Sequence, residues 1–155
     1  MSSKTRKIIL TVLSVYICFI FIQSLFFKFA GAPEPTHIFS TLDDWARNSL
    51  GLGGLFFPSG LGAIFGGAIF NATAIGIAEL ICSALLLIGL IAGAAKLHML
   101  GALGAMATMT GAIFFHLFTP LGVVVLDDSG LLFINACLVW CAAAAILYLR
   151  TRATA

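Results

Sequence analysis

The stretch NATAIGIAELICSALLLIGL, from Asn71 to Leu90, decides the fold of this chain. It lies in an apolar run over residues 68–92, which is long enough to cross the roughly 30 Å hydrocarbon core of a bilayer. Because unpaired backbone groups are costly in lipid, the run is predicted to be a helix. Glu79 lies about halfway along it, so its carboxyl group must be protonated, paired or in contact with water.

Three other runs have the same character, at residues 8–30, 98–119 and 131–149. Of the whole chain, 61% of residues are hydrophobic and 9% are charged, with a mean hydropathy of +1.14. A soluble domain of this composition would expose one large apolar surface, so the expected solvent is the lipid bilayer. We predict an all-α polytopic membrane protein, a single integral membrane domain over residues 1–155 with a bundle of four transmembrane helices.

The first run is interpreted as a retained helix rather than a cleaved signal peptide. It is longer than the apolar region of a signal peptide, and Pro33 would directly follow the small-residue cleavage site at residues 30–32. Small residues at four-residue spacing, such as Gly89 and Gly93, predict close contacts between the helices.

Several classes of function are not expected from these residues. The net charge is only +2 and no Lys/Arg-rich cluster indicates nucleic-acid binding. Nucleophile-elbow, P-loop and dinucleotide motifs are missing, and no H-x-x-x-H or E-x-x-H spacing predicts a metal site. The four cysteines lie in apolar runs without a C-x-x-C motif, which predicts buried small hydrophobic residues: Cys18, Cys82, Cys137 and Cys141.

The distribution of basic residues predicts the orientation. They precede the first run, lie between the second and third, and follow the fourth: Lys4, Arg6, Lys7, Lys96, Arg150 and Arg152. Five of the six acidic residues lie in the segments on the other side. The positive-inside rule therefore predicts cytoplasmic N- and C-termini for this multi-pass protein, with residues 31–67 outside. In a bacterium, the expected location is the inner (plasma) membrane.

The outer segment 31–67 has two parts. Thr36 is predicted to cap a short amphipathic helix from His37 to about Asn48. This helix either lies in the membrane interface with Trp45 as its anchor or packs over the bundle. The glycine-rich stretch that follows, residues 51–67, is interpreted as a hydrophobic flap over the mouth of the bundle, with a re-entrant segment or a linker as alternatives.

Six polar side chains are expected in the outer half or near the middle of the membrane. They come from all four helices and are the predicted ligand-binding residues: Gln23, Lys28, Asn71, Glu79, His116 and Asn135. Ionisable groups inside a membrane are functional candidates, so Glu79 and His116 are the candidate catalytic residues. We expect a polar pocket open to the outside, with Lys28 at its mouth. A hydrogen bond to Gln23, at similar depth, would satisfy Glu79, whereas Lys28 or His116 could pair with it only if the second run shifts outward. Considered by itself, Lys28 could equally extend its ammonium to the lipid headgroups and leave its stem in lipid.

The motifs LFFKFAG (25–31), IFSTL (38–42), GIAEL (76–80), LLLIGL (85–90) and LGALGAMATMTGAIFFHL (100–117) resemble the DoxX family. The resemblance covers roughly Gln23 to Tyr148, and residues 51–67 look like an insertion. It implies a small four-helix inner-membrane protein whose polar signature falls on Lys28, Glu79 and His116. Some members of the family are linked to sulfur and thiol redox chemistry and to the quinone pool.

Three functions are compatible with these features. The first is a redox-linked accessory subunit that binds a quinone or a similar small lipophilic molecule. Its electrons would come from a redox partner subunit, because the chain has no cofactor motif. The second is a binding or transport module for a small solute or a lipid, for which four helices would need a homo-oligomer. The third is a non-catalytic membrane scaffold subunit.

Overall fold

The computed structural model describes residues 2–53, 56–57 and 70–152. Four long helices form a bundle: α1 (Ser3–Ala30), α4 (Ala72–Ile91), α5 (Ala95–Phe118) and α6 (Leu131–Thr151). All four are long and apolar enough to cross a membrane. The predicted all-α polytopic four-helix bundle is therefore confirmed.

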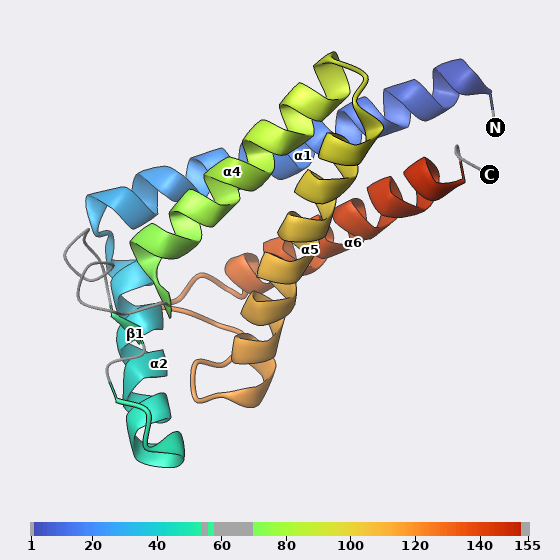
Figure 1. Ribbon diagram of the computed structural model, residues 1–155. Helices are drawn as coiled ribbons and strands as arrows, with labels where there is room; N and C mark the ends of the chain where they lie inside the picture. The colour runs from blue at the N-terminus through green and yellow to red at the C-terminus, as the bar shows by residue number, and fades with distance from the viewer. Residues whose placement is uncertain (1, 54–55, 58–69, 153–155) are drawn as a thin grey trace.

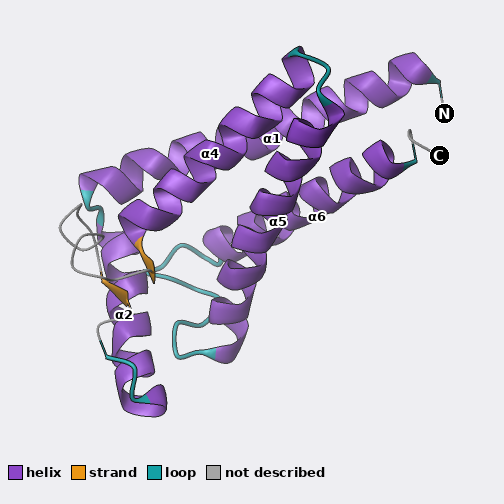
Figure 2. Cartoon of the chain, in the orientation of Figure 1, coloured by secondary structure: helices purple, strands orange, loops and turns teal. Residues whose placement is uncertain are grey.

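Neighbours in the bundle follow a simple order. α1 packs against α4 and α6, and α5 packs against the same two helices. The N- and C-termini lie at the same end of the molecule (Figure 1). The rest of the described chain is helical or loop, apart from one pair of short strands (Figure 2).

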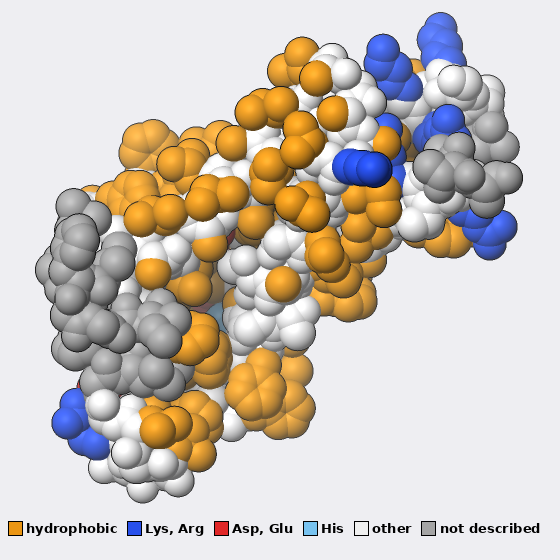
Figure 3. Space-filling model, viewed as in Figure 1, with side chains coloured by type: hydrophobic (Ala, Val, Ile, Leu, Met, Phe, Trp, Pro, Cys, Tyr) orange, Lys and Arg blue, Asp and Glu red, His pale blue; other side chains and the backbone are white. Residues whose placement is uncertain are grey.

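The outside of the long helices is apolar. Phe26, Phe118 and Ile91 expose 73%, 68% and 85% of their surface, and hydrophobic side chains cover much of the visible face in Figure 3. Such large exposed side chains are stable in hydrocarbon and costly in water. The bundle surface therefore suits contact with a lipid bilayer.

Small residues bring α4 and α5 close together. A Cβ atom on Gly89 would collide with the backbone nitrogen of His98, and one on Gly101 would lie 2.7 Å from the backbone nitrogen of Leu86. Glycine alone allows this approach, so the predicted contact role of Gly89 is confirmed. Gly93 instead has a positive φ of 66° in the turn between the two helices, with open space around it.

The ends of the helices differ from the predicted bounds by up to five residues. α1 begins at Ser3 rather than residue 8, because the Ser2 hydroxyl accepts a hydrogen bond from the Thr5 N–H and starts the helix in the polar segment. α4 begins at Ala72 because the side chain of Asn71 caps it. α5 begins earlier than predicted, at Ala95 rather than residue 98, and α6 ends later, at Thr151 rather than residue 149.

The helix α2 spans Pro33–Leu50 and is longer than predicted. Thr36 does not cap it, because Pro33 occupies the first turn and the Thr36 hydroxyl donates to the Ala32 carbonyl inside the helix. The apolar face packs on the start of α4, on the end of α5 and on the loop after it, through Phe39, Leu42, Ala46, Ala72, Leu121 and Val125. This packing favours the alternative in which the amphipathic helix covers the bundle.

Most of the predicted flap lies outside the described residues. What is described there is Gly51–Gly53, together with the parallel pairing of β1 (Phe56–Phe57) and β2 (Phe70–Asn71).

The loop between α5 and α6 is organised by one carboxylate. Asp128 accepts hydrogen bonds from the backbone N–H groups of Val125, Gly130 and Leu132 at 2.8–2.9 Å. Partial burial acts to raise the pKa of the Asp128 carboxyl. The three donors and the nearby His116 ring outweigh that effect and hold this pKa below its usual value.

All four cysteines are unbridged. Cys18 and Cys82 are buried, as predicted, and Cys137 is partly buried. The prediction is wrong for Cys141, which lies on the exposed surface of α6. Every face of this helix is apolar, so position along it does not show which side is covered.

Candidate functional site

The centre of the candidate site is a buried ion pair between α1 and α4. The Lys28 Nζ lies 2.6 Å from the Glu79 Oε2, and both side chains are largely buried, with 15% and 4% exposed. The Ser24 Oγ lies 2.7 Å from the same carboxylate oxygen and accepts a hydrogen bond from Lys28 at 2.9 Å. Ser24 has one hydroxyl proton, which it can donate either to Glu79 or to the Phe21 carbonyl 2.8 Å away.

Helix geometry explains how a lysine near the end of α1 reaches a glutamate deep in α4. Side chains on a helix point back toward its N-terminus, and residues four apart share a face. Lys28 therefore extends back to Ser24, one turn further from the end of α1, where the ammonium meets the carboxylate.

The partner of Glu79 is Lys28, not Gln23, the residue that similar depth suggested. Gln23 is exposed on the surface of α1, whereas Ser24 faces the carboxylate. Neighbouring helical residues are rotated by about 100° from each other, so equal depth does not give contact. The expectation that the ammonium of Lys28 faces a polar group rather than lipid is confirmed, although its partner is Glu79.

The ion pair keeps spare hydrogen-bonding capacity. An ammonium has three N–H donors, and Lys28 uses two of them on Ser24 and Glu79. The second oxygen of Glu79, Oε1, accepts no hydrogen bond from the described residues. Among the described residues, the Tyr16 hydroxyl is the only fully buried side-chain N or O atom that lacks a hydrogen-bond partner. Because Oε1 of Glu79 also lacks a partner, it is not fully buried and has accessible surface. One donor and one acceptor thus lie side by side.

His116 is buried in the last turn of α5 and is hydrogen-bonded to the loop that follows. Its Nδ1 lies 2.6 Å from the Gly122 carbonyl oxygen and must donate to it. In the form with a single ring proton, Nε2 is then an acceptor. The ring also packs edge-on against Phe133, with centroids 5.7 Å apart. Among the described contacts, no hydrogen bond joins His116 to Glu79, so the two candidate catalytic residues are not directly coupled.

The two predicted asparagines have different surroundings. Asn71 is fully buried and its side-chain oxygen accepts from the Ala74 N–H, which makes it a helix cap. Asn135 is partly exposed near the start of α6, and its side chain makes no hydrogen bond within the described segments. Asn71 is thus explained by local structure, and Asn135 retains its polar groups for another partner.

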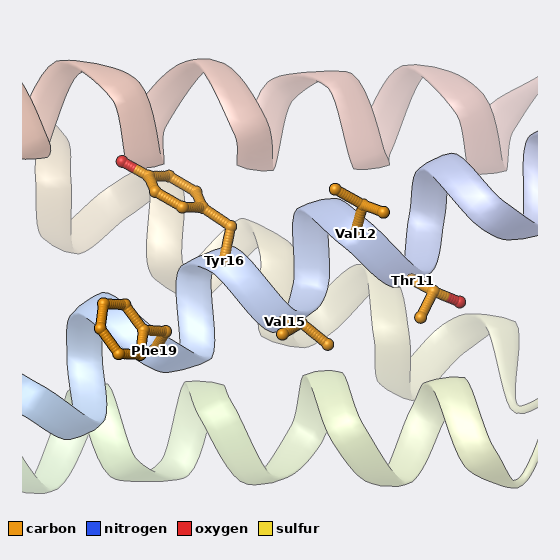
Figure 4. A pocket seen from close by; sticks show the side chains of 5 residues that line it. All are labelled: Thr11, Val12, Val15, Tyr16 and Phe19. Carbon is orange, nitrogen blue, oxygen red and sulfur yellow. The ribbon is translucent and has the colours of Figure 1, made fainter.

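Two hollows can be distinguished on the molecule. Figure 3 shows one near the middle of the visible face, in which small areas of acidic and of histidine side chain can be seen. The other is an apolar groove of about 520 Å³ on the outside of α1 (Figure 4), lined by Thr11, Val12, Val15, Tyr16 and Phe19. None of the predicted ligand-binding residues lines this groove, which suits a lipid chain.

A second buried polar network lies toward the end of the bundle that carries the termini. Its members are Ser14, His98 and Arg150, and the first two are completely buried. The polar candidates predicted from the sequence lie only in the outer half or near the middle of the membrane, so they do not include this network. They do not include Ser24 either, although its four-residue spacing from Lys28 is a usable signal.

Within the described ranges, no three metal-ligating side chains come together. No protein-family model matches the chain, and neither a curated protein nor a solved structure matches it. The chemistry of the site must therefore be inferred from the ion pair itself.

Proposed function

We propose that this protein is a DoxX-like, redox-linked accessory subunit that binds a quinone or a similar small lipophilic molecule at the Lys28–Glu79 pair. The observation that carries the proposal is the spare donor and spare acceptor of an ion pair held between two membrane-spanning helices. The motifs that resemble the DoxX family support the same residues.

Energetics favour a functional role for the pair. Removing two charges from water is expensive, and an apolar pair of similar size would often stabilise a buried site as well or better. Charged groups within membrane-spanning helices are accordingly rare and mark binding or proton-transfer sites. Ser24 supports the pair but does not remove this cost.

The geometry fits a ligand whose polar group changes between acceptor and donor. The carbonyl oxygen of a quinone would accept from the third N–H of Lys28, and the hydroxyl of a quinol would donate to Oε1 of Glu79. Conversion between the two forms takes two electrons and two protons. In this proposal Glu79 exchanges protons with the ligand, His116 serves a second proton path, and a separate redox protein supplies the electrons.

The proposed location is the bacterial inner membrane, with both termini in the cytoplasm. Six of the eight Lys and Arg residues of the sequence lie near the termini or in the short turn between α4 and α5. Blue basic side chains gather toward that end in Figure 3. Reporter fusions at the C-terminus test this: cytoplasmic GFP should fluoresce and alkaline phosphatase should be inactive.

Native mass spectrometry with lipid analysis tests the ligand. The wild-type protein, purified in mild detergent and loaded with ubiquinone or menaquinone, should retain the quinone. Glu79→Gln and Lys28→Met should lose it, whereas Gln23→Leu, an exposed polar residue next to Ser24, should retain it. An empty wild-type protein, or quinone binding that ignores both substitutions in the ion pair, would contradict the proposal and favour a scaffold role.

A further inference from the structure

The network at the terminal end of the bundle has a fixed direction of hydrogen bonding. Arg150 Nε donates to His98 Nδ1 at 3.1 Å, so this ring nitrogen carries no proton. The other ring nitrogen, Nε2, therefore donates to the Ser14 Oγ at 2.8 Å. Ser14 in turn donates to the Leu10 carbonyl at 2.7 Å. His98 is thus a neutral acceptor that holds the guanidinium of Arg150 in one orientation.

The positive charge of Arg150 is not neutralised by the described chain. The ion pairs among the described residues are Lys28–Glu79 and Arg47–Asp43, both remote from this end. None of the six acidic residues of the sequence belongs to the segments near the termini or to the α4–α5 turn. The charge that acts on Arg150 is that of Arg6, which is also positive.

The free edge of the guanidinium remains available to a ligand. Among the described residues, Arg150 makes a hydrogen bond only through Nε. Its two terminal nitrogens have no hydrogen-bond partner there and are not fully buried. These nitrogens carry four N–H donors in a planar fork, which matches two oxygens of a phosphate group. The positive charge of Arg6, which also acts on Arg150, increases the attraction for an anion.

We propose that Arg150, oriented by His98 and assisted by Arg6, is the centre of a phosphate-binding site at the terminal end of the bundle. Arg150 lies in the last turn of α6, where a membrane-spanning helix meets the headgroups. The phosphate group therefore belongs either to an anionic lipid or to a free phosphate ion. The site is independent of the Lys28–Glu79 pair, which lies closer to the other end of α1.

The test compares two neighbouring arginines on the same helix. Arg150→Gln removes the oriented guanidinium, and Arg152→Gln removes an equal charge from an exposed arginine that stacks 5.1 Å from the Tyr148 ring. Arg150→Lys keeps the charge but loses the planar fork. Folding of every variant is checked by size-exclusion chromatography and thermal unfolding, and Arg150→Lys serves if Arg150→Gln does not fold.

Binding is measured by native mass spectrometry of the detergent-purified protein with added phosphatidylglycerol, phosphatidylcholine or inorganic phosphate. We expect Arg150→Gln to weaken binding about tenfold or more and Arg150→Lys to weaken it by a smaller factor. Arg152→Gln should change it less than about twofold. Dependence on Arg150 for phosphatidylglycerol identifies a lipid headgroup site, and the same dependence for inorganic phosphate identifies a free-ion site. Equal losses in Arg150→Gln and Arg152→Gln, or no binding of any probe, would overturn the proposal.

Discussion

Replacing Lys28 by methionine should destabilise the protein more than replacing both members of the ion pair. Lys28→Met leaves the carboxylate of Glu79, which is 4% exposed, without its counter-ion. Breaking a buried pair in this way costs about 3–5 kcal/mol. Because 15% of the Lys28 side chain is exposed, solvent weakens the interaction, and we expect the lower end of that range, about 3 kcal/mol. The double variant Lys28→Met/Glu79→Leu should lie within about 1 kcal/mol of the wild type.

Thermal unfolding in detergent, followed by the loss of the monodisperse peak in size-exclusion chromatography, measures the effect. At about 2–4 °C per kcal/mol for a chain of this size, Lys28→Met should lower Tm by roughly 6–12 °C. Gln23→Leu is the matched control, since it removes an exposed polar group one residue from Ser24 and should leave Tm unchanged.

The comparison of the single and double variants separates two roles of the pair. If the double variant keeps its stability but no longer retains quinone, the pair serves binding rather than folding. A double variant that loses as much stability as Lys28→Met would refute the reasoning, because the pair would then contribute net folding energy. An unchanged Lys28→Met would refute it as well.

The remaining predictions concern packing, charge and one unpaired hydroxyl. Gly89→Val should cost about 3 kcal/mol or more, because its side chain would meet the backbone of His98, whereas Gly111→Ala, with open space around it, should be neutral or slightly stabilising in the same unfolding assay. Asp128→Asn should remove about 1 kcal/mol at pH 7. Since the folded-state pKa of Asp128 is lowered, its contribution is present above the unfolded pKa and disappears as pH falls through the folded value. Unfolding measured from pH 7 down to about pH 3 should therefore show the wild type and the Asn variant converging, and a constant gap would contradict this. Tyr16→Phe should raise stability by up to about 1 kcal/mol, because it removes an enclosed hydroxyl that has no partner in the described part of the chain, and a lower Tm would reveal a hidden hydrogen bond.

The amino-acid sequence alone determined the number of membrane-spanning helices, their approximate bounds and their chemical class. Length and hydropathy are sufficient for this, because the thickness of the hydrocarbon core sets the length of each helix. The sequence also placed Lys28, Glu79 and His116 as polar groups of the outer half, since the depth of a residue follows from its position along a helix. An even number of spans likewise predicts the termini at one end, where the structure places them.

Only the tertiary structure decided which polar groups meet. In a helix that is apolar on all sides, no hydrophobic face shows which residues turn toward a neighbour. Depth alone made Gln23 a possible partner of Glu79, whereas the rotation of α1 brings Ser24 to the carboxylate and the length of the Lys28 side chain brings its ammonium there. His98 and Arg150 are 52 residues apart and meet only because α5 and α6 are neighbours. Hydropathy fixes where a residue lies across the membrane, and helix packing fixes what it touches.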